Sequence, residues 1–531
     1  MTKHKITEPA HSFMYQPSQL QVTRPLVDTE HVLGLVSEYL EHPFNDRQEE
    51  AFQKSFTERL SLLWGPPGTG KTVVLAGIIL GWIEDAQERG SSVIIGVGSS
   101  NYYAIDNVLS EVTDLLDRRQ RMMKNIPYQV RVIRIRSESA KPPRDDRLED
   151  IVRTSEEAHT LADELSNSTR CIIIGGTWMQ LSKLAEAYAA EKSLAANWFD
   201  LIVIDEASQV PVSSAAAYFL LLKGDGHVVL AGDHKQLGPI YSFEMRNSNQ
   251  GLFDCIFSYM QDSLNKTPVS LDLNYRTNIE ISEWPRVRFY PQGYEAFSPD
   301  RQLRISLPTP TGKPPAGWPT QLAWSDQFLR ILDPNVPVVV ICYGAHASTL
   351  SNQFEAQIVA SLAILYRHVL YQEDKFDNYQ FWDRCLGIVT PHRAQMSTIR
   401  NILVAGAGMS MDPPPFVDTV DRFQGQERDL MIASYAVADR DFVAAEESFI
   451  LDPRRFNVTL TRAKSKFIML ISDAILQHLP SDADVARDAA HLQLFVESYC
   501  TSINEDIELP YIENGHVVNK SCRLKGRRDA P

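Results

Sequence analysis

A glycine-rich segment near residue 65 has the residue types and spacing of a phosphate-binding loop. It consists of Gly65, Pro66, Pro67, Gly68, Thr69, Gly70, Lys71 and Thr72, which fits the pattern G-x-x-x-x-G-K-[ST]. Glycines let backbone N–H groups approach phosphate oxygens, the lysine reaches the β- and γ-phosphates, and the final hydroxyl binds Mg²⁺. The helical pattern that follows directs its positive end at the phosphates. We therefore expect ATP and Mg²⁺ to bind at this loop.

Two adjacent carboxylates, Asp205 and Glu206, follow the apolar run at 201–204. In an open parallel sheet, the carboxyl end of a buried strand lies near the phosphate-binding loop. Asp205 is expected to hold Mg²⁺, directly or through water, and Glu206 to accept the proton of the attacking water. Together, the loop and the carboxylates predict an enzyme that hydrolyses ATP.

The elements that must position these groups form two series of short apolar runs separated by helical patterns. Such β-branched runs are typical of parallel strands covered by helices on both faces. The first series comprises 61–64, 92–98, 171–176, 201–207 and 227–233, and the second comprises 336–343, 385–391, 429–435 and 466–472. The sequence thus predicts two α/β units in tandem, although no internal sequence repeat is visible.

Composition shifts divide the chain further. We expect a flanking segment at 1–42, a first α/β domain at 43–265 and a second at 266–480. The charged, mostly helical stretch 107–168 is predicted to be an accessory insertion in the first domain. A Pro-rich loop is expected at 291–337 within the second domain, and a helix with a polar tail at 481–531.

The overall charge and the cysteines exclude several classes of protein. A net charge of −15 argues against a protein that coats nucleic acid through a general basic field. No apolar run is long enough to cross a membrane, and the first residues lack a signal-peptide core, so a cytoplasmic protein is expected. The six cysteines are scattered without a C-x-x-C pair, which indicates reduced thiols and no zinc module.

One stretch, 118–136, is strongly basic. It contains no acid and seven cations, namely Arg118, Arg119, Arg121, Lys124, Arg131, Arg134 and Arg136. Two interpretations stay open: a solvated helix face with a strand edge, or a surface that binds a nucleic-acid strand.

Further motifs show a family resemblance. They are FNDRQ (44–48), DEASQ (205–209), AGDHKQLGPI (231–240), LNYR (273–276), VDTVDRFQGQERD (417–429) and LDPRRFNVTLTRAKS (451–465). Together with the phosphate loop, and in this order, they resemble the superfamily 1 helicases, most of all the group with the nonsense-mediated-decay helicase and senataxin. The resemblance implies two RecA-like domains that hydrolyse ATP in the cleft between them and act on single-stranded DNA or RNA, with 5′-to-3′ movement.

The resemblance also assigns roles around ATP. Gln48 matches the glutamine that reads the adenine edge, and Glu427 matches an acid at the ribose. Gln236 matches the glutamine near the γ-phosphate that links hydrolysis to domain movement. Arg276 and Arg462 match two arginines of the second domain, where planar guanidinium groups stabilise charge on the transferred phosphoryl group.

Seven residues match strand-contacting positions. They are Ser100, Asn101 and Thr177 in the first domain, and Thr390, Pro391, Arg393 and Thr419 in the second. Hydroxyl, amide and backbone groups of this kind bind phosphates without reading bases. The neighbouring Tyr102 and Tyr103 could stack on bases, or they could pack in the core.

The sequence departs from the family ahead of the phosphate loop. Many relatives have a β-barrel insertion and a helical stalk there, whereas about 42 residues precede the motif at 44–48, so we expect neither. This leaves an alternative function: a nucleic-acid-stimulated ATPase that acts as a switch or remodelling subunit without processive unwinding, with a partner protein supplying the missing accessory elements. An unrelated P-loop kinase would require the motifs of the second domain to be accidental.

Overall fold

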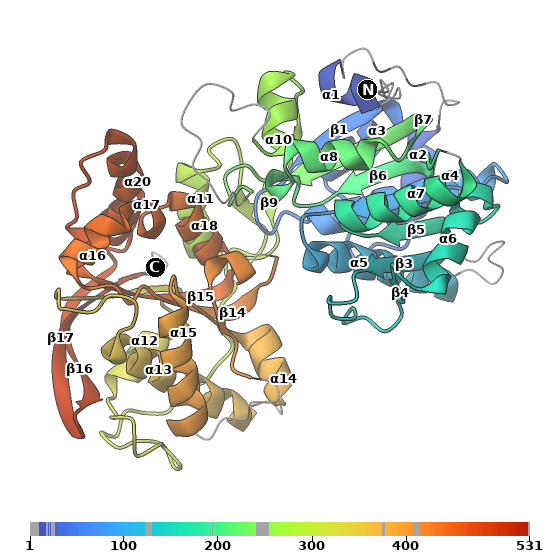
Figure 1. Cartoon of the computed structure of the whole chain (residues 1–531). Helices are drawn as coiled ribbons and strands as arrows, with labels where there is room; N and C mark the ends of the chain where they lie inside the picture. The colour runs from blue at the N-terminus through green and yellow to red at the C-terminus, as the bar shows by residue number, and fades with distance from the viewer. Residues whose placement is uncertain are drawn as a thin grey trace. The chain divides into compact units, whose positions relative to one another are not determined.

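The computed structural model describes residues 10–16, 20, 22, 27–122, 130–193, 195–239, 254–373, 377–406, 414–423 and 425–528. Lys124 of the basic stretch, Ile240 of the third motif and Gln424 of the QGQE segment lie outside the described residues. The chain divides into two compact units, Met1–Asp272 and Leu273–Pro531, which are called unit 1 and unit 2 below (Figure 1). Each unit has its own central sheet, so the predicted pair of α/β units is confirmed.

Unit 1 is built on an eight-stranded sheet in the order β4-β3-β5-β2-β6-β7-β1-β8. All neighbouring strands are parallel. The strands are β1 (Leu60–Trp64), β2 (Ile94–Gly98), β3 (Arg131–Arg136), β4 (Glu149–Val152), β5 (Ile172–Gly175), β6 (Phe199–Ile204), β7 (Leu222–Gly232) and β8 (Val269–Ser270). Every residue of β1, β2, β5 and β6 is buried, as expected for parallel strands covered on both faces.

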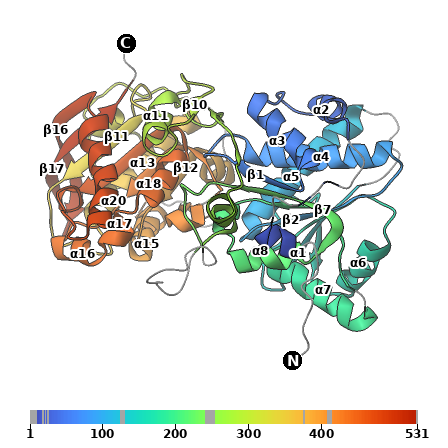
Figure 2. The ribbon, with the colours of Figure 1, turned by 90° about the horizontal axis from the view of Figure 1, so that it is seen from above.

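Helices cover both faces of this sheet. Figure 2 shows α2, α3, α4 and α5 on one side and α1, α6, α7 and α8 on the other. Their bounds are α1 (Ala10–Tyr15), α2 (Thr29–Ser37), α3 (Asp46–Thr57), α4 (Lys71–Glu88), α5 (Tyr102–Met122), α6 (Glu156–Asn167), α7 (Trp178–Lys192) and α8 (Val212–Phe219), with the short α10 (Ile256–Ser258) near the end of the unit. The predicted flanking segment contributes to this packing, because Val32 and Val36 of α2 belong to the core around α4.

The segment 107–168 is more than the predicted helical insertion. It supplies most of α5 and all of α6, but also β3 and β4, which extend the main sheet at one edge. For β3, only a strand edge within 118–136 was expected, as one of two interpretations, because arginines interrupt its apolar residues, and Ile133 and Ile135 alone are too few to reveal the alternation. This segment is therefore an integral part of unit 1.

Unit 2 has a seven-stranded sheet in the order β13-β12-β14-β15-β11-β17-β16. Five strands are parallel and the last two form an antiparallel hairpin. The strands are β11 (Val338–Tyr343), β12 (Leu386–Val389), β13 (Val417–Asp418), β14 (Arg428–Ser434), β15 (Ala463–Ser472), β16 (Ile503–Glu513) and β17 (His516–Arg527), beside the small pair β9 (Leu273–Asn274) and β10 (Glu295–Ala296).

The helices of unit 2 surround this sheet. They are α11 (Ile279–Arg288), α12 (Gln327–Leu332), α13 (Gln353–Glu373), α14 (Asn378–Gln380), α15 (Arg393–Asn401), α16 (Arg440–Ala445), α17 (Glu447–Ile450), α18 (Pro453–Thr461), α19 (Asp473–Leu476) and α20 (Ala483–Leu494). The Pro-rich segment 291–337 is mostly loop, as predicted, and includes only β10 and α12 as regular elements.

The two units repeat one strand order. The set β5-β2-β6-β7-β1 in unit 1 corresponds to β13-β12-β14-β15-β11 in unit 2. In both sets, the strand that comes first in the chain (β1 or β11) lies beside the strand that comes last (β7 or β15). The strand that comes third (β5 or β13) lies beside the strand that comes second (β2 or β12). The shared architecture lets equivalent positions of the two units be compared directly, although their sequences show no repeat.

The C-terminal prediction of a helix and a polar tail was half wrong. The helix α20 is present, but β16 and β17 then form a long hairpin, in which β17 pairs with β11. The hairpin turns at Asn514 and Gly515, which have φ values of 51° and 79°. An Asn-Gly pair between alternating segments is a strong hairpin signal that could have revealed this element. Among the described residues, no helix is long and apolar enough to cross a membrane.

Candidate active site

Five motifs of unit 1 follow five neighbouring strands. The phosphate loop follows β1, Asp205 and Glu206 follow β6, and the segment with Gln236 follows β7. Ser100 and Asn101 follow β2, and Thr177 follows β5. Because β5, β2, β6, β7 and β1 are neighbours in a parallel sheet, all five motifs lie at the same edge.

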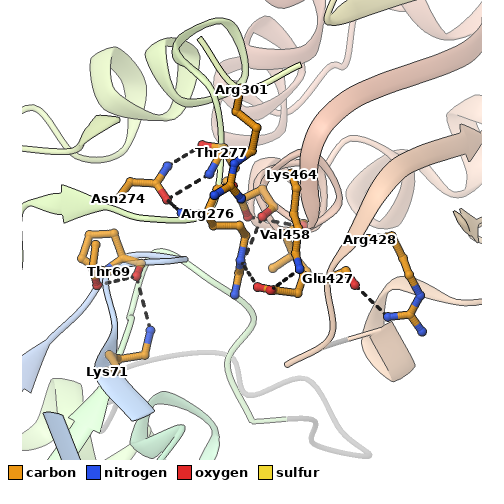
Figure 3. Close-up of polar contacts among 12 residues, drawn as sticks. Thr69, Lys71, Asn274, Arg276, Thr277, Arg301, Glu427, Arg428, Val458 and Lys464 are labelled. Carbon is orange, nitrogen blue, oxygen red and sulfur yellow. Dashed lines mark hydrogen bonds and ion pairs between the residues drawn. The ribbon is translucent and has the colours of Figure 1, made fainter. Parts of the chain in front are cut away.

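The phosphate loop is shaped by its glycines and its lysine. Gly68 and Gly70 have φ values of 77° and 83°, which favour glycine, and Gly70 is the residue before α4. The Thr69 hydroxyl donates to the Pro66 carbonyl at 2.8 Å (Figure 3). The Lys71 ammonium donates to the carbonyl of Gly65. A Cβ atom at Gly65 would clash with Cγ of Lys71. The loop thus forms the narrow backbone cradle that a phosphate chain requires, with its lysine folded back on it.

Gln48 lies against this cradle. Its Nε2 donates to the Thr69 carbonyl at 3.2 Å, while its Oε1 accepts from the backbone N–H of Asn45 at 3.1 Å. The Asn45 side chain in turn accepts from the N–H of Gln48, which completes a capping box at the start of α3. The amide of Gln48 therefore joins the N-terminus of α3 to the phosphate loop.

Asp205 and Glu206 form a compact acidic pair at the end of β6. Burial and the charge of Glu206 raise the pKa of Asp205 to about 7, and Lys71 acts in the opposite direction. Glu206 has a φ of 50°, a left-handed conformation that is uncommon for this residue type and concentrates at functional sites. The adjacent Gly232 leaves little room here, since a Cβ atom on it would lie 2.8 Å from the N of Ser208.

The chemistry of this pair fits a bound Mg²⁺ ion. A buried carboxylate with only partial compensation from Lys71 favours an additional cation. Among the described residues, no group of three or more His, Cys, Asp or Glu side chains could form a metal cage by itself. Mg²⁺ is usually bound by one or two carboxylates together with substrate phosphates, so Asp205 and the Thr72 hydroxyl are suited to hold it.

A buried aspartate orients Gln236. Asp233 accepts from Nε2 of Gln236 at 2.8 Å and from the indole N–H of Trp64 at 3.1 Å. Trp64 is the last residue of β1, immediately before the phosphate loop. Asp233 was not singled out in the sequence, although its place in AGDHKQL directly after β7 could have indicated it.

In unit 2, Arg276 is held by an acid and a carbonyl. Its Nε donates to Oε2 of Glu427 at 2.5 Å and its guanidinium also donates to the Thr461 carbonyl at 3.1 Å (Figure 3). Lys464 binds the other carboxylate oxygen of Glu427 at 2.8 Å. Burial alone would raise the pKa of Glu427, but the two cations lower it to about 2. Both carboxylate oxygens of Glu427, the acid expected at the ribose, therefore bind cations. Lys464 is a member of this site that was not identified from the sequence.

These groups share one edge of the second sheet. Glu427 directly precedes β14, and Arg462 directly precedes β15. Because β14 and β15 are parallel neighbours, both residues lie at the amino edge of the sheet. The backbone N–H of Arg428 donates to the Arg462 carbonyl at 3.0 Å, which joins the two segments.

Unit 2 has a carboxylate where unit 1 has its phosphate loop. Glu355 lies in the first turn of α13, which follows β11, the counterpart of β1. It accepts hydrogen bonds from the hydroxyls of Tyr343 and Ser434 and, at 2.9 Å, from the N–H of Ala436. Burial raises the pKa of Glu355 to about 7. An acid at this position disfavours phosphate, so the phosphate cradle belongs to unit 1.

The strand-contact candidates of unit 1 lie at helix N-termini. Asn101 Oδ1 accepts from the N–H of Ala104 at 2.9 Å at the start of α5, and the Ser100 hydroxyl donates to Oε1 of Gln209 at 3.3 Å. Thr177 precedes α7 and makes no side-chain capping bond. Hydroxyls and N–H groups at such termini suit phosphate contacts.

In unit 2, Thr390 follows β12 and Thr419 follows the neighbouring β13. This is the carboxyl edge of the sheet, opposite to the edge that contains Glu427. Thr390 and Pro391 line a small cavity of about 30 Å³ together with Phe449 and Arg455. Arg393 starts α15 and is exposed to solvent.

The structure differs from both interpretations of the basic stretch, because most of its described arginines have acidic partners and two of them, Arg119 and Arg134, are buried. Arg119 forms a buried ion pair with Glu84, and Arg134 pairs with Asp106 at 2.6 Å. Arg131 pairs with Glu149 and Glu164, and Arg136 pairs with Asp150. These ion pairs neutralise much of the positive charge of the stretch at 118–136.

The adjacent tyrosines are engaged with the same region. The hydroxyl of Tyr102 accepts from the N–H of Ser137 at 3.1 Å, and the Arg134 guanidinium lies 4.5 Å from the Tyr102 ring centre. Arg144 lies 5.8 Å from the ring centre of Tyr103. For Tyr102, packing within unit 1 thus accounts for the aromatic ring.

A phosphate cradle, an acidic pair after β6 and two units with one strand order define a tandem RecA-like P-loop protein. Two AAA domain models match the chain, one over residues 43–193 and 181–242 and the other over 252–474. Together with the motifs, these matches show that the chain belongs to the superfamily 1 helicases, and its relatives include members of the nonsense-mediated-decay helicase group.

Two relatives are named ATP-dependent helicases. The chain is 26% identical over 444 residues to NAM7 of Saccharomyces cerevisiae, a match that covers 80% of this chain and 41% of that protein. It is 26% identical over 462 residues to upf1 of Schizosaccharomyces pombe, covering 81% of this chain and 45% of that protein. The chain thus spans less than half the length of both relatives. A solved structure of the DUF1998 helicase MrfA bound to DNA and AMPPNP aligns with a TM-score of 0.42 and 13% identity, covering 89% of this chain and 53% of that one.

Proposed function

We propose that the chain is an ATP-dependent helicase or translocase that acts on single-stranded DNA or RNA. The observation that supports this best is the row of motifs at one edge of unit 1. The phosphate loop and the Asp205–Glu206 pair share that edge with Ser100, Asn101 and Thr177. A row of hydroxyl and N–H donors beside an ATPase centre suits a motor that moves along a phosphate backbone.

In the proposed reaction, Lys71 leaves the Gly65 carbonyl and binds the β- and γ-phosphates of ATP. Asp205 and Thr72 would hold Mg²⁺, and the ion would neutralise charge on the phosphate oxygens. A water molecule attacks the γ-phosphorus, Glu206 accepts its proton, and ADP leaves. Gln236, oriented by Asp233, responds to the γ-phosphate.

We further propose that Arg276 and Arg462 of unit 2 stabilise the transferred phosphoryl group. Arginines in this role are worth roughly 10³–10⁵ in rate. Their segments are joined within unit 2, since Arg276 donates to the carbonyl of Thr461, the residue before Arg462. Gln48 and Glu427 are proposed to contact the adenine and the ribose.

The alternative is an ATP-dependent switch or remodelling subunit that does not unwind processively and works with a partner protein. The hydrogen bonds of Arg276 to Glu427 and Thr461 favour this alternative function, because an arginine that is bonded within its own unit must be released before it can act on ATP.

One experiment separates these functions. ATP hydrolysis is measured without nucleic acid and with matched single-stranded DNA and RNA, and then displacement of a tailed duplex is measured. A helicase is stimulated and displaces the strand, whereas a switch is stimulated without displacement. A rate that neither nucleic acid changes would contradict both, and Lys71→Ala controls for contaminating ATPases.

A further inference from the structure

The side chain of Gln209 joins the proposed general base to a proposed strand contact. Its Nε2 donates to Oε2 of Glu206 at 3.1 Å, and its Oε1 accepts from the hydroxyl of Ser100 at 3.3 Å. The amide of Asn101 donates to the same Ser100 hydroxyl at 3.4 Å. A continuous hydrogen-bonded path thus runs from the carboxylate after β6 to the two residues after β2.

The backbone fixes this arrangement. Residues Ala207–Gln209 form a short 3₁₀ turn, in which the N–H of Gln209 donates to the Glu206 carbonyl at 2.8 Å. The strands β2 and β6 are parallel neighbours, with Gly98 opposite Ile204. The turn after β6 therefore lies beside the segment that leaves β2. Both strands belong to unit 1, so the path lies within one compact unit.

We propose that Gln209 is a positioning residue that couples the binding of a single nucleic-acid strand to ATP hydrolysis. This inference rests on the proposed function. When no nucleic-acid strand is bound, the Gln209 amide donates to the Glu206 oxygen that would otherwise accept the proton of the attacking water. A strand phosphate that accepts from the Ser100 hydroxyl removes the donor from Oε1 of Gln209. The amide then loses its second anchor and turns away, which frees the Glu206 carboxylate.

The chemistry of the amide makes it suited to this task. Its carbonyl oxygen and its NH₂ group are coupled rigidly, so a change of partner at one end reorients the other end. A hydroxyl can donate only one hydrogen, so Ser100 cannot donate to Gln209 and to a phosphate at once. The bond from Ser100 to Gln209 and a bond from Ser100 to a nucleic-acid phosphate are thus mutually exclusive.

The test uses the full chain and the variant Gln209→Ala, with a single-stranded oligothymidylate and an oligouridylate as probes. The kcat and the KM for ATP are measured with and without each probe, and strand affinity is measured by fluorescence anisotropy. Gln209→Ala is expected to raise the strand-free kcat several-fold and bring the stimulation ratio close to one. The KM for ATP should change less than about twofold, and the affinity for the nucleic-acid strand should stay equal or rise, because Ser100 no longer donates to Gln209.

Ser100→Ala supplies a second measurement from the other end of the path. It should also raise the strand-free kcat, but weaken strand binding. If the parent is stimulated and both variants keep its ratio and its strand-free kcat, the inference is wrong while the proposed function stands. If the parent itself shows no stimulation by either probe, the proposed function fails, and the coupling fails with it.

Discussion

Nε of Arg276 lies 2.5 Å from Oε2 of Glu427, at a carboxylate whose other oxygen is bound by Lys464. The Arg276 guanidinium also donates to the Thr461 carbonyl at 3.1 Å, and the backbone carbonyl of Arg276 accepts from the Arg301 guanidinium at 2.7 Å. Arg276, which is proposed to act on ATP, is thus hydrogen-bonded within unit 2. Its release must compete with a strong, charge-assisted bond.

Lys464→Met should lower the stimulated kcat about tenfold, with little change in the KM for ATP. Without Lys464, Glu427 retains a single cation, so its attraction for Arg276 grows. Steady-state ATPase assays with saturating oligonucleotide check this. Lys464→Arg should restore most of the rate, and Lys313→Met, at an exposed lysine of the same unit, serves as the matched control. An unchanged kcat in Lys464→Met would remove Lys464 from the account.

Lys71→Ala and Glu206→Gln should each reduce ATP turnover by at least about 10²-fold while the fold is retained. The first removes the cation for the β- and γ-phosphates, and the second removes the proton acceptor. Hydrolysis rates are compared with circular dichroism and thermal melting of the same preparations. Lys141→Ala, at an exposed lysine of unit 1, should behave as the parent. Parent-like turnover of either site variant would place the chemistry elsewhere.

Glu355 should make unit 2 less stable as pH rises. Its pKa is raised from 4.5 to about 7 in the fold, so the folded state binds the extra proton between these values. The free energy of unfolding therefore falls as pH increases through this interval, by on the order of 2–3 kcal/mol. Urea denaturation at pH 5 and pH 8, followed by a probe in unit 2, measures it.

Glu355→Gln should largely abolish this pH dependence, because the amide is neutral and can accept the bonds from Ser434 and Ala436. Glu295→Gln, at an exposed residue, is the control. The same slope in Glu355→Gln as in the parent would mean that another group titrates.

The affinity for a single nucleic-acid strand should depend on Arg393 and not on the basic stretch at 118–136. Arg393→Ala removes an exposed cation beside Thr390 and should weaken binding, with the salt slope reduced by about one. Arg121→Ala is the comparison, since it removes an exposed cation of the basic stretch. Fluorescence anisotropy between 50 and 200 mM salt measures both variants. A larger loss for Arg121→Ala would restore the interpretation of that stretch as a surface that binds a nucleic-acid strand.

The sequence alone indicated the parts of the fold that depend on local pattern. Buried parallel strands such as β6 are uniformly apolar, and the phosphate loop is a contiguous motif, so both were predictable. For β3, only a strand edge was expected, as one of two interpretations, because Arg131, Arg134 and Arg136 obscure its alternation until their acidic partners on other elements are known. The hairpin of β16 and β17 has a polar solvent face and resembles a tail, apart from its Asn-Gly turn.

Within the site, residue identities followed from motifs, but their partners did not. Nothing local links Arg276 to Glu427, which are separated by 151 positions. The contact of Gln209 with Ser100 likewise depends on β2 and β6 being neighbours, although β3, β4 and β5 lie between them in the chain. Long-range pairings of this kind require the sheet order.

We propose that unit 1 binds ATP and that arginines of unit 2 accelerate its hydrolysis when a nucleic-acid strand is bound. The decisive measurement is single-turnover hydrolysis of bound ATP by the parent and by Arg462→Ala, with saturating single-stranded oligonucleotide present. Arg462→Ala should bind ATP with nearly parental affinity but hydrolyse it roughly 10³-fold or more slowly. Hydrolysis by Arg462→Ala at the parental rate would contradict this proposal.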